Sequence, residues 1–283
     1  MHTPERMQVK KSPTWKIQDI PAFCITIERR HDRWKRFQDQ SGIDGLPLKR
    51  FLGVDGKTLD PKTDDRIAVL TKRNILAKTR RSHEELDSIG GVGCALSHIA
   101  VWQWMVDNQQ EVCLIFEDDA VVPPDFIQNA NACIEQSAVL GSKQWDIWLI
   151  GGIWDNVSRI PGEKAVQRVG AFFQFQAYIV TLSTAKRLLR DVYPIHAHID
   201  VWVSIYAYMN DLRIVACPTL KLLQYVAAKT DIQSEEGCPM CNVPTQFYKT
   251  HQMVSKNEWR IAQVATVVCA CALLYVVVRH RST

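Results

Sequence analysis

The stretch between residues 90 and 120 constrains the fold of this chain most strongly. It opens with three glycines and continues with apolar residues that recur at spacings of three and four between positions 96 and 106. This periodicity predicts a glycine-rich turn followed by a helix that packs on one face. Residues 112–116 then form an unbroken apolar run of strand length, which is typical of a central parallel strand covered on both faces. An α/β fold is therefore expected.

Three acids, Glu117, Asp118 and Asp119, follow directly after this apolar run. Adjacent carboxylates repel one another, and a fold that keeps them ionised normally supplies a cation. Their oxygens suit Mg or Mn, which often complete their shell with substrate phosphates. In open α/β sheets ligands also bind at the carboxyl ends of the strands. We therefore predict a divalent metal site; alternatively, Asp118 or Asp119 caps the next helix, or the acids form a solvated turn.

These residues resemble a known family. The pattern Gly-x-Gly-Cys-x-x-Ser-His-x-x-x-Trp between Gly91 and Trp102, followed by a strand that ends Glu-Asp-Asp, is similar to glycosyltransferase family 25. That family includes lipooligosaccharide β-galactosyltransferases and collagen galactosyltransferases. The resemblance implies a GT-A-like, mostly parallel sheet with flanking helices. It also implies transfer of a hexose, galactose before glucose, from a UDP-sugar to a glycan or protein acceptor, with Mn (or Mg) as cofactor.

Several further residues are candidates for the nucleotide-sugar site. Arginine forks match phosphate geometry, although a charged run is also typical of a solvated helix face. An acid after a second strand can bind a ribose hydroxyl, although Asp-Gly is also an ordinary turn. A histidine on a packed helix face is either a ligand or a core residue. The family resemblance adds Gln224 and Asp231, which lie toward the end of the transferase domain, as candidates for the metal or diphosphate site. The set is Arg29, Arg30, Asp55, His98, Asp118, Gln224 and Asp231, beside the metal ligands Glu117 and Asp119.

Asp200 is the candidate catalytic base. An inverting sugar transfer needs a general base on the acceptor hydroxyl, and the family places an Ile/Val-Asp pair before a helix here. Aspartate is also a favoured helix N-cap, and the two roles are compatible. Phe175 and Gln176 replace the small residues usual before the family's Tyr-Ile-x-Ser strand, which alters the expected shape of the pocket.

Composition excludes some classes of protein. A formal net charge of +4 over 283 residues is too weak and dispersed to indicate a nucleic-acid partner. The nine cysteines form no regular framework, so reduced thiols are expected. Cys238 and Cys241 form a single CxxC pair, which is weak evidence for zinc.

A separate apolar segment occupies residues 261–278. It contains no charged residue, is bracketed by basic residues and would span roughly 27 Å as a helix. We expect a polar leader (1–19), a transferase domain (20–233), a tether (234–260) and this single-pass C-terminal transmembrane helix (261–278), with the catalytic domain facing the cytosol.

Two functions from other classes stay open. One is a non-catalytic membrane-anchored module of the same fold that binds a nucleotide sugar or a partner. The other is a metal-dependent phosphoryl or nucleotidyl transferase that uses the same acids. The sequence has no GxxxxGK[ST] loop, which counts against one large group of such enzymes.

Overall fold

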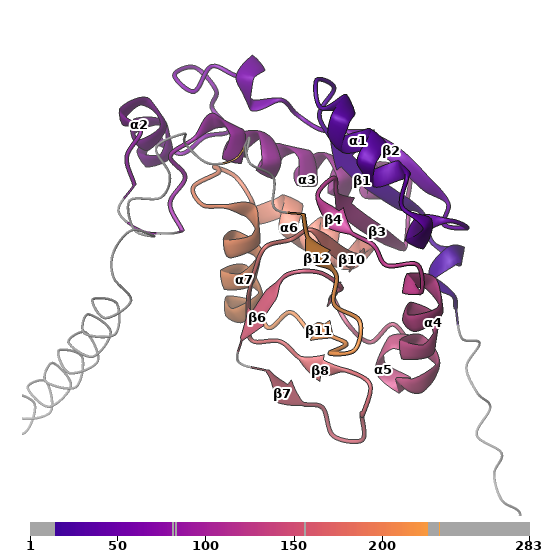
Figure 1. Cartoon of the computed structure of the whole chain (residues 1–283). Helices are drawn as coiled ribbons and strands as arrows, with labels where there is room; N and C mark the ends of the chain where they lie inside the picture. Colours follow the sequence, from indigo (N-terminus) through magenta and orange to yellow (C-terminus); the bar gives the residue numbers. More distant parts are fainter. Residues whose placement is uncertain (1–14, 81, 83, 156, 226–231, 233–283) are drawn as a thin grey trace, which may run out of the picture. The chain divides into compact units, whose positions relative to one another are not determined.

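The computed structural model of the chain describes residues 15–80, 82, 84–155, 157–225 and 232 (Figure 1). The described helices are the α-helices α1 (His31–Gln38), α2 (Val69–Ala77), α3 (Ile89–Asp107), α4 (Phe126–Gln136), α5 (Ala138–Gly141), α6 (Leu182–Asp191) and α7 (Ile199–Met209), with the short 3-10 turns η1 (Ile17–Asp19), η2 (Ser41–Ile43) and η3 (Gly56–Thr58).

A mixed sheet forms the centre of the fold. Its strands, in spatial order, are β2 (Leu48–Leu52), β1 (Ala22–Thr26), β3 (Val112–Glu117), β10 (Ala177–Thr181), β5 (Ile147–Leu149), β11 (Ile214–Ala216), β8 (Gln167–Arg168) and β7 (Ser158–Arg159). Two small antiparallel pairs lie beside it: β4 (Ala120–Val121) with β12 (Leu223–Gln224), and β6 (Ile153–Asp155) with β9 (Ala171–Phe173).

Strand direction differs in part from the prediction. β3 runs parallel to β1, which runs parallel to β2, so these three strands end at the same edge of the sheet. On its other side β3 pairs antiparallel with β10, and β10 pairs antiparallel with β5. The predicted α/β architecture is confirmed, but the sheet is mixed rather than mostly parallel. A short apolar run does not reveal the direction of its neighbours.

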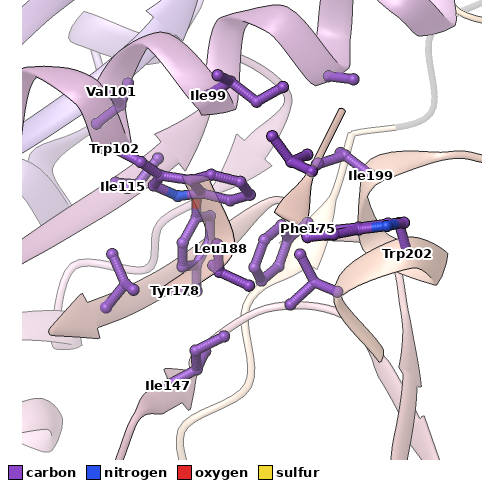
Figure 2. Close-up of a cluster of buried hydrophobic side chains, with 14 of the residues drawn as sticks. Ile99, Val101, Trp102, Ile115, Ile147, Phe175, Tyr178, Leu188, Ile199 and Trp202 are labelled. Atoms are coloured by element: carbon purple, nitrogen blue, oxygen red, sulfur yellow. The ribbon is translucent and has the colours of Figure 1, made fainter. Parts of the chain in front are cut away.

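Helices cover both faces of this sheet and bury two separate cores. One core packs α3, α6 and α7 against the sheet, with Trp102, Tyr178 and Phe175 near its centre (Figure 2). The other packs η1, α1, α4 and α5 against the opposite face, with Trp145 and Trp148 fully buried. Because β3 lies between the two cores, all of its apolar side chains are buried, as an unbroken apolar run predicts.

The glycine-rich segment is part of a helix rather than a turn. α3 begins at Ile89, with the Ser88 hydroxyl accepting a hydrogen bond from the Gly91 N–H at 3.2 Å, so Gly91 and Gly93 are both helical. A Cβ on Gly93 would lie 2.6 Å from the Gly56 nitrogen and 2.7 Å from the Val54 carbonyl oxygen. The glycines therefore allow α3 to approach the loop after β2, which explains why residues of low helix propensity occur here.

The expectation of reduced thiols is wrong for one pair of cysteines. Cys133 of α4 is joined to Cys217, directly after β11, by a disulfide. Cys24, Cys94 and Cys113 are free. The sequence gives no signal for the pairing, because the two cysteines are 84 residues apart and only the fold brings them together.

Other expectations fall outside the described residues. These are the first fourteen residues of the leader, the tether, the apolar segment 261–278, Cys238, Cys241 and Asp231. Within the described residues, α3 is the helix long and apolar enough to cross a membrane, and 61% of it is buried inside the domain, as in the core helix of a globular protein.

Candidate functional site

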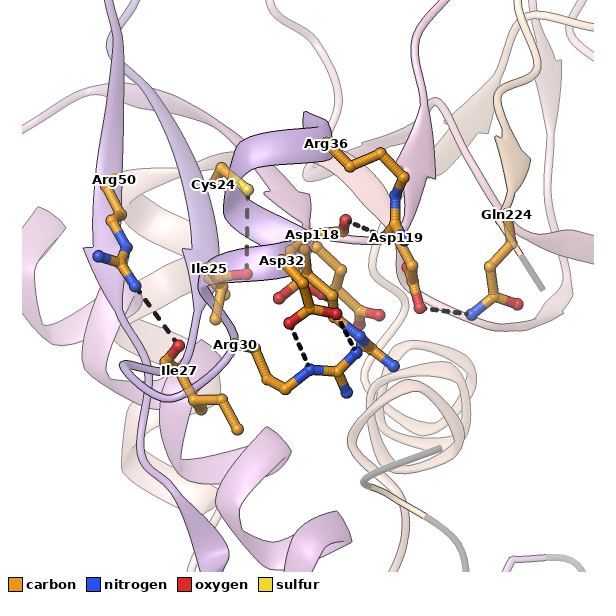
Figure 3. Close-up of polar contacts among 12 residues, drawn as sticks. Cys24, Ile25, Ile27, Arg30, Asp32, Arg36, Arg50, Asp118, Asp119 and Gln224 are labelled. Carbon is orange, nitrogen blue, oxygen red and sulfur yellow. Dashed lines mark hydrogen bonds and ion pairs between the residues drawn. The ribbon is translucent and has the colours of Figure 1, made fainter. Parts of the chain in front are cut away.

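The acids predicted to bind metal lie where β1, β2 and β3 end together. Glu117 is the last residue of β3, and Asp118 and Asp119 form the turn into β4. Asp118 and Asp119 are each 7% exposed, so a solvated turn does not describe them. Each of the three acids has a different set of partners; Figure 3 shows the contacts of Arg36 with Asp118 and of Gln224 with Asp119.

Asp118 is neutralised by an arginine of α1. The Arg33 guanidinium lies 3.1 Å from Asp118 Oδ1, and the two side chains are only 11% and 9% exposed. Arg36, one turn further along α1, donates to the Asp118 main-chain carbonyl at 3.0 Å. Asp118 therefore anchors the helix after β1 to the end of β3, and Arg33 supplies one positive charge to the acid cluster.

Glu117 ends a hydrogen-bonded chain that begins in the core. The Trp102 indole N–H donates to the Tyr178 hydroxyl at 3.0 Å, and that hydroxyl lies 2.9 Å from His98 Nδ1. His98 Nε2 in turn lies 3.1 Å from Glu117 Oε1. Burial lowers the pKa of His98 to about 4, so the imidazole is neutral at physiological pH. It orients the Glu117 carboxylate without compensating its charge.

Asp119 is held on one side only. Gln224 of β12 donates from Nε2 to Asp119 Oδ2 at 3.0 Å, and the Tyr225 N–H donates to the Asp119 carbonyl at 2.7 Å. Oδ1 of the same carboxylate is buried and has no hydrogen-bond partner among the described residues. A buried, unpartnered carboxylate oxygen costs free energy unless something else binds it.

Ionisation of Glu117 and Asp119 is disfavoured at this edge. Burial raises the pKa of Glu117 to about 8, and the charges of Asp200 and Asp118 add to the rise. Burial also raises the pKa of Asp119 to about 7, with Glu117 as the next cause. The positive charge of Arg33 lowers both pKa values, but by less than the other causes raise them. Carboxyl oxygens whose ionisation requires an added positive charge fit a hard divalent cation such as Mn or Mg.

The predicted arginines lie near the ends of the neighbouring strands. Arg29 Nε lies 2.6 Å from Asp55 Oδ2, so the loops after β1 and β2 are bridged at the sheet edge. Burial by itself would raise the pKa of Asp55. Hydrogen bonds from Arg29 and the Lys57 N–H outweigh burial and hold this pKa below its usual range. Asp55 also caps the turn η3, as the alternative interpretation expects. Arg30 pairs with Asp32, 2.8 Å away.

Asp200 lies in the first turn of α7, where its carboxylate accepts a hydrogen bond from the Gln174 N–H at 2.6 Å. It does not cap its own helix, because His198 is the N-cap residue. Asp200 is close enough to Glu117 for its charge to raise the pKa of that group. The fold therefore brings together residues from α3, β3 and α7 that are far apart in sequence.

Sequence reasoning missed several residues of this edge. Ser97 accepts a hydrogen bond from the Val54 N–H at 2.8 Å and donates to the Gly93 carbonyl at 2.7 Å, which fixes α3 against the loop after β2. Tyr178 and Arg36 were not singled out either. His98 and Trp102 are four residues apart and therefore lie on one helix face, which indicates that they share a partner. The spacing does not identify that partner as the Tyr178 hydroxyl.

Replacing Arg33 by Met should destabilise the domain by about 3–5 kcal/mol, because Asp118 would stay buried without its partner. The matched control is Lys35→Met on the same helix, which breaks an exposed pair with Asp39 (73% and 56% exposed) and should cost about 0.5 kcal/mol. Urea unfolding monitored by tryptophan fluorescence measures the free energy of unfolding of both variants. Equal losses in the two variants would show that Arg33 does not stabilise a buried charge.

Comparison with known proteins identifies the family of this chain. Residues 19–203 match glycosyltransferase family 25 (LPS biosynthesis protein). A glycosyltransferase 25 family member of Anopheles gambiae is 30% identical over 183 residues, which are 63% of this chain and 30% of the mosquito protein. Procollagen galactosyltransferase 1 of Danio rerio is 26% identical over 60% of this chain and 28% of its own length.

A third relative is named a probable inactive glycosyltransferase 25 family member 3, from Rattus norvegicus. It is 24% identical over 84% of this chain and 40% of the rat protein. The chain thus spans roughly a third of the length of the relatives that it matches. The family match covers most of the described domain, including Arg29, His98, the three acids and Asp200, so the chain belongs to glycosyltransferase family 25.

Proposed function

We propose that this chain is a metal-dependent glycosyltransferase that moves a hexose from a UDP-sugar to a glycan or glycoprotein acceptor. The observation that carries the proposal is the buried pair Glu117 and Asp119, with Asp119 Oδ1 unpartnered at the edge where three parallel strands end. Membership of family 25 supports a sugar transfer rather than a phosphoryl or nucleotidyl transfer.

Glu117 and Asp119 would hold the cation, Mn or Mg. When bound, it supplies charge neutralisation for the diphosphate leaving group. Asp118 is already paired with Arg33, so its role is to position the turn that carries the two ligands. His98 and Gln224 orient Glu117 and Asp119 respectively through their hydrogen bonds.

Arg29 and Asp55 are proposed to contact the nucleotide at the adjacent strand ends. Their ion pair is partly exposed, at 35% and 21% of the two side chains, so a diphosphate or ribose can reach both groups. Arg30, also on the loop after β1, is a further candidate for phosphate contact. Asp231, which lies outside the described residues, stays a candidate for the metal or diphosphate site on the family resemblance alone.

Asp200 is proposed as the general base of an inverting transfer. Its carboxylate is half-buried, and the Gln174 N–H fixes one oxygen, which leaves the second oxygen to accept a proton from an acceptor hydroxyl. A carboxylate in this position can act as a general base toward the acceptor hydroxyl.

Galactose is the proposed sugar, with glucose next. Two relatives support this choice: they are procollagen galactosyltransferase 1 of Danio rerio and procollagen galactosyltransferase 2 of Homo sapiens. Phe175 and Gln176 border the site: Phe175 stacks 3.6 Å from the Tyr178 ring, and the Gln176 carbonyl accepts the Glu117 N–H at 2.9 Å.

Asp119→Asn should lower Mn-dependent turnover of a UDP-sugar at least a hundredfold. The substitution keeps the shape of the side chain but removes a ligand charge, and about 2.7 kcal/mol of lost transition-state stabilisation corresponds to this factor. Hydrolysis or transfer of a panel of nucleotide sugars measures it. The control is Asp125→Asn, which alters an exposed acid six residues later and should leave turnover unchanged. Equal rates in both variants and the parent would contradict the role of Asp119.

Asp200→Asn should lower kcat by a factor of about 100 to 10,000, the usual contribution of a general base, while UDP-sugar binding stays within about twofold. Its matched control, Asp211→Asn, changes an acid whose side chain is 89% exposed beyond the same helix. Steady-state kinetics combined with calorimetric titration of the donor separates the two effects. An unchanged kcat would exclude Asp200 as the base.

A non-catalytic, nucleotide-sugar-binding module is the second candidate function. It is favoured by the probable inactive relative, which aligns with 84% of this chain. Tight binding of a UDP-sugar without turnover of any donor in the panel would support this module. The intact acids and Asp200 favour the enzyme.

We also propose that residues 261–278 anchor the chain in a membrane as a single-pass helix, because the run is apolar, uncharged and flanked by basic residues. Replacing Leu273 and Leu274 by lysine should abolish carbonate-resistant membrane association, since each central lysine costs about 3 kcal/mol on insertion scales. Exchanging both residues for isoleucine is the control. Full retention of the lysine variant in the membrane pellet would contradict a spanning helix.

A further inference from the structure

We propose that Cys94, His98 and Glu117 form a binding site for a thiophilic divalent cation of the Zn²⁺ class, and that occupancy of this site inhibits the transferase. The inhibitory part rests on the proposed function, whereas ion binding does not. The proposal comes from the juxtaposition of three different donor atoms at the base of the candidate site.

The helix and the strand place the three donors together. Cys94 and His98 are four residues apart on α3, so their side chains lie one turn apart on one helix face. Glu117 reaches them from the end of β3. The Cys94 sulfur, one His98 ring nitrogen and one Glu117 oxygen all lie within 4.8 Å of one another.

The distances suit a small tetrahedral ion. His98 Nε2 and Glu117 Oε1 are 3.1 Å apart. Two ligands bound at about 2.0–2.1 Å to one tetrahedral zinc ion lie about 3.3 Å apart, close to this separation. Only the thiol has to approach further, and Cys94 is half-buried rather than enclosed. The fourth position would remain for water or a substrate oxygen, as in zinc sites with three protein ligands.

The donor set also selects the ion. Thiolate and imidazole ligands favour Zn²⁺ and Co²⁺, whereas Mn²⁺ and Mg²⁺ favour oxygen. His98 has the outer hydrogen bond that zinc-bound histidines usually make, because its Nδ1 lies 2.9 Å from the Tyr178 hydroxyl. That hydroxyl also receives the Trp102 N–H, so the ring orientation is fixed from the core. The imidazole therefore presents Nε2 to the ion without reorganisation of the core.

Glu117 connects this site to catalysis. The same carboxylate is the proposed ligand of the Mn²⁺ or Mg²⁺ that acts on the diphosphate. An ion bound by Cys94, His98 and Glu117 would occupy this carboxylate, so that Glu117 could not also complete the Mn²⁺ or Mg²⁺ site with Asp119. Zinc should therefore oppose activation by manganese, and excess manganese should overcome the inhibition.

Cobalt binding to the full chain tests the site directly. A Cys238→Ser/Cys241→Ser background removes the CxxC pair, so that a thiolate-to-cobalt charge-transfer absorption reports other cysteines. Titration of this protein with Co²⁺ alone, with the Cys133–Cys217 disulfide intact, should give the absorption band at a stoichiometry of about one ion. Adding Cys94→Ser should remove the band, whereas adding Cys113→Ser, a buried free cysteine on β3, should keep it.

A second variant protects the test against misfolding of Cys94→Ser. His98→Gln should weaken cobalt binding at least tenfold while the thiolate band persists at saturation. No band in the background protein, or an unchanged band after Cys94→Ser, would overturn the proposal. These outcomes are read without any enzymatic assay, so they are distinct from failure of the proposed function.

The inhibitory role is tested on the active full chain. The zinc concentration that halves Mn²⁺-supported turnover should rise at least tenfold in Cys94→Ser, with each variant compared with its own uninhibited rate. Cys113→Ser should leave that concentration unchanged. Equal zinc sensitivity of Cys94→Ser and the parent would refute inhibition through this site even if cobalt binds there.

Discussion

Crowded negative charge at the end of β3 is the constraint on which the rest of this structure depends. Three consecutive acids are buried or half-buried at the edge of a sheet whose core is otherwise apolar. Burial of an ionised carboxylate is costly unless it is paired, hydrogen-bonded or bound to metal. Each surrounding element contributes a residue that pairs with one of these carboxylates or donates a hydrogen bond to it.

A different part of the chain supplies the partner of each acid. α1 supplies Arg33 to Asp118, α3 supplies His98 to Glu117, and β12 supplies Gln224 to Asp119. Only the first of these partners carries a full positive charge, because the histidine is neutral and the glutamine is an amide. This shortage of positive charge is the basis of the proposal that the edge binds a divalent cation together with an anionic sugar donor.

Sequence reasoning located this edge but not its internal pairing. The apolar run at 112–116 and the acids after it predicted a buried strand with a polar end, and parallel pairing of β1, β2 and β3 brings Arg29, Asp55 and Glu117 to one edge. Which arginine meets which acid could not be predicted, because Arg29, Arg30 and Arg33 have the same chemistry. The direction in which α1 leaves β1 decides that Arg33 reaches Asp118.

The errors have physical reasons as well. Glycines predicted a turn at 90–93, but tight packing of α3 against residues 54–56 requires glycine inside the helix. The strand β10 inserts antiparallel between β3 and β5, and periodicity carries no information on strand direction. The Cys133–Cys217 disulfide depends on the meeting of α4 with the end of β11, which local sequence does not encode.

Calorimetric titration of UDP into the full chain, with and without Mn²⁺, tests the central claim most directly. If Glu117 and Asp119 together bind a cation that bridges to a diphosphate, Mn²⁺ should tighten UDP binding at least tenfold, a coupling of about 1.4 kcal/mol. The reverse titration should show the same factor for Mn²⁺. Equal UDP affinity in the presence and absence of the metal would contradict the account.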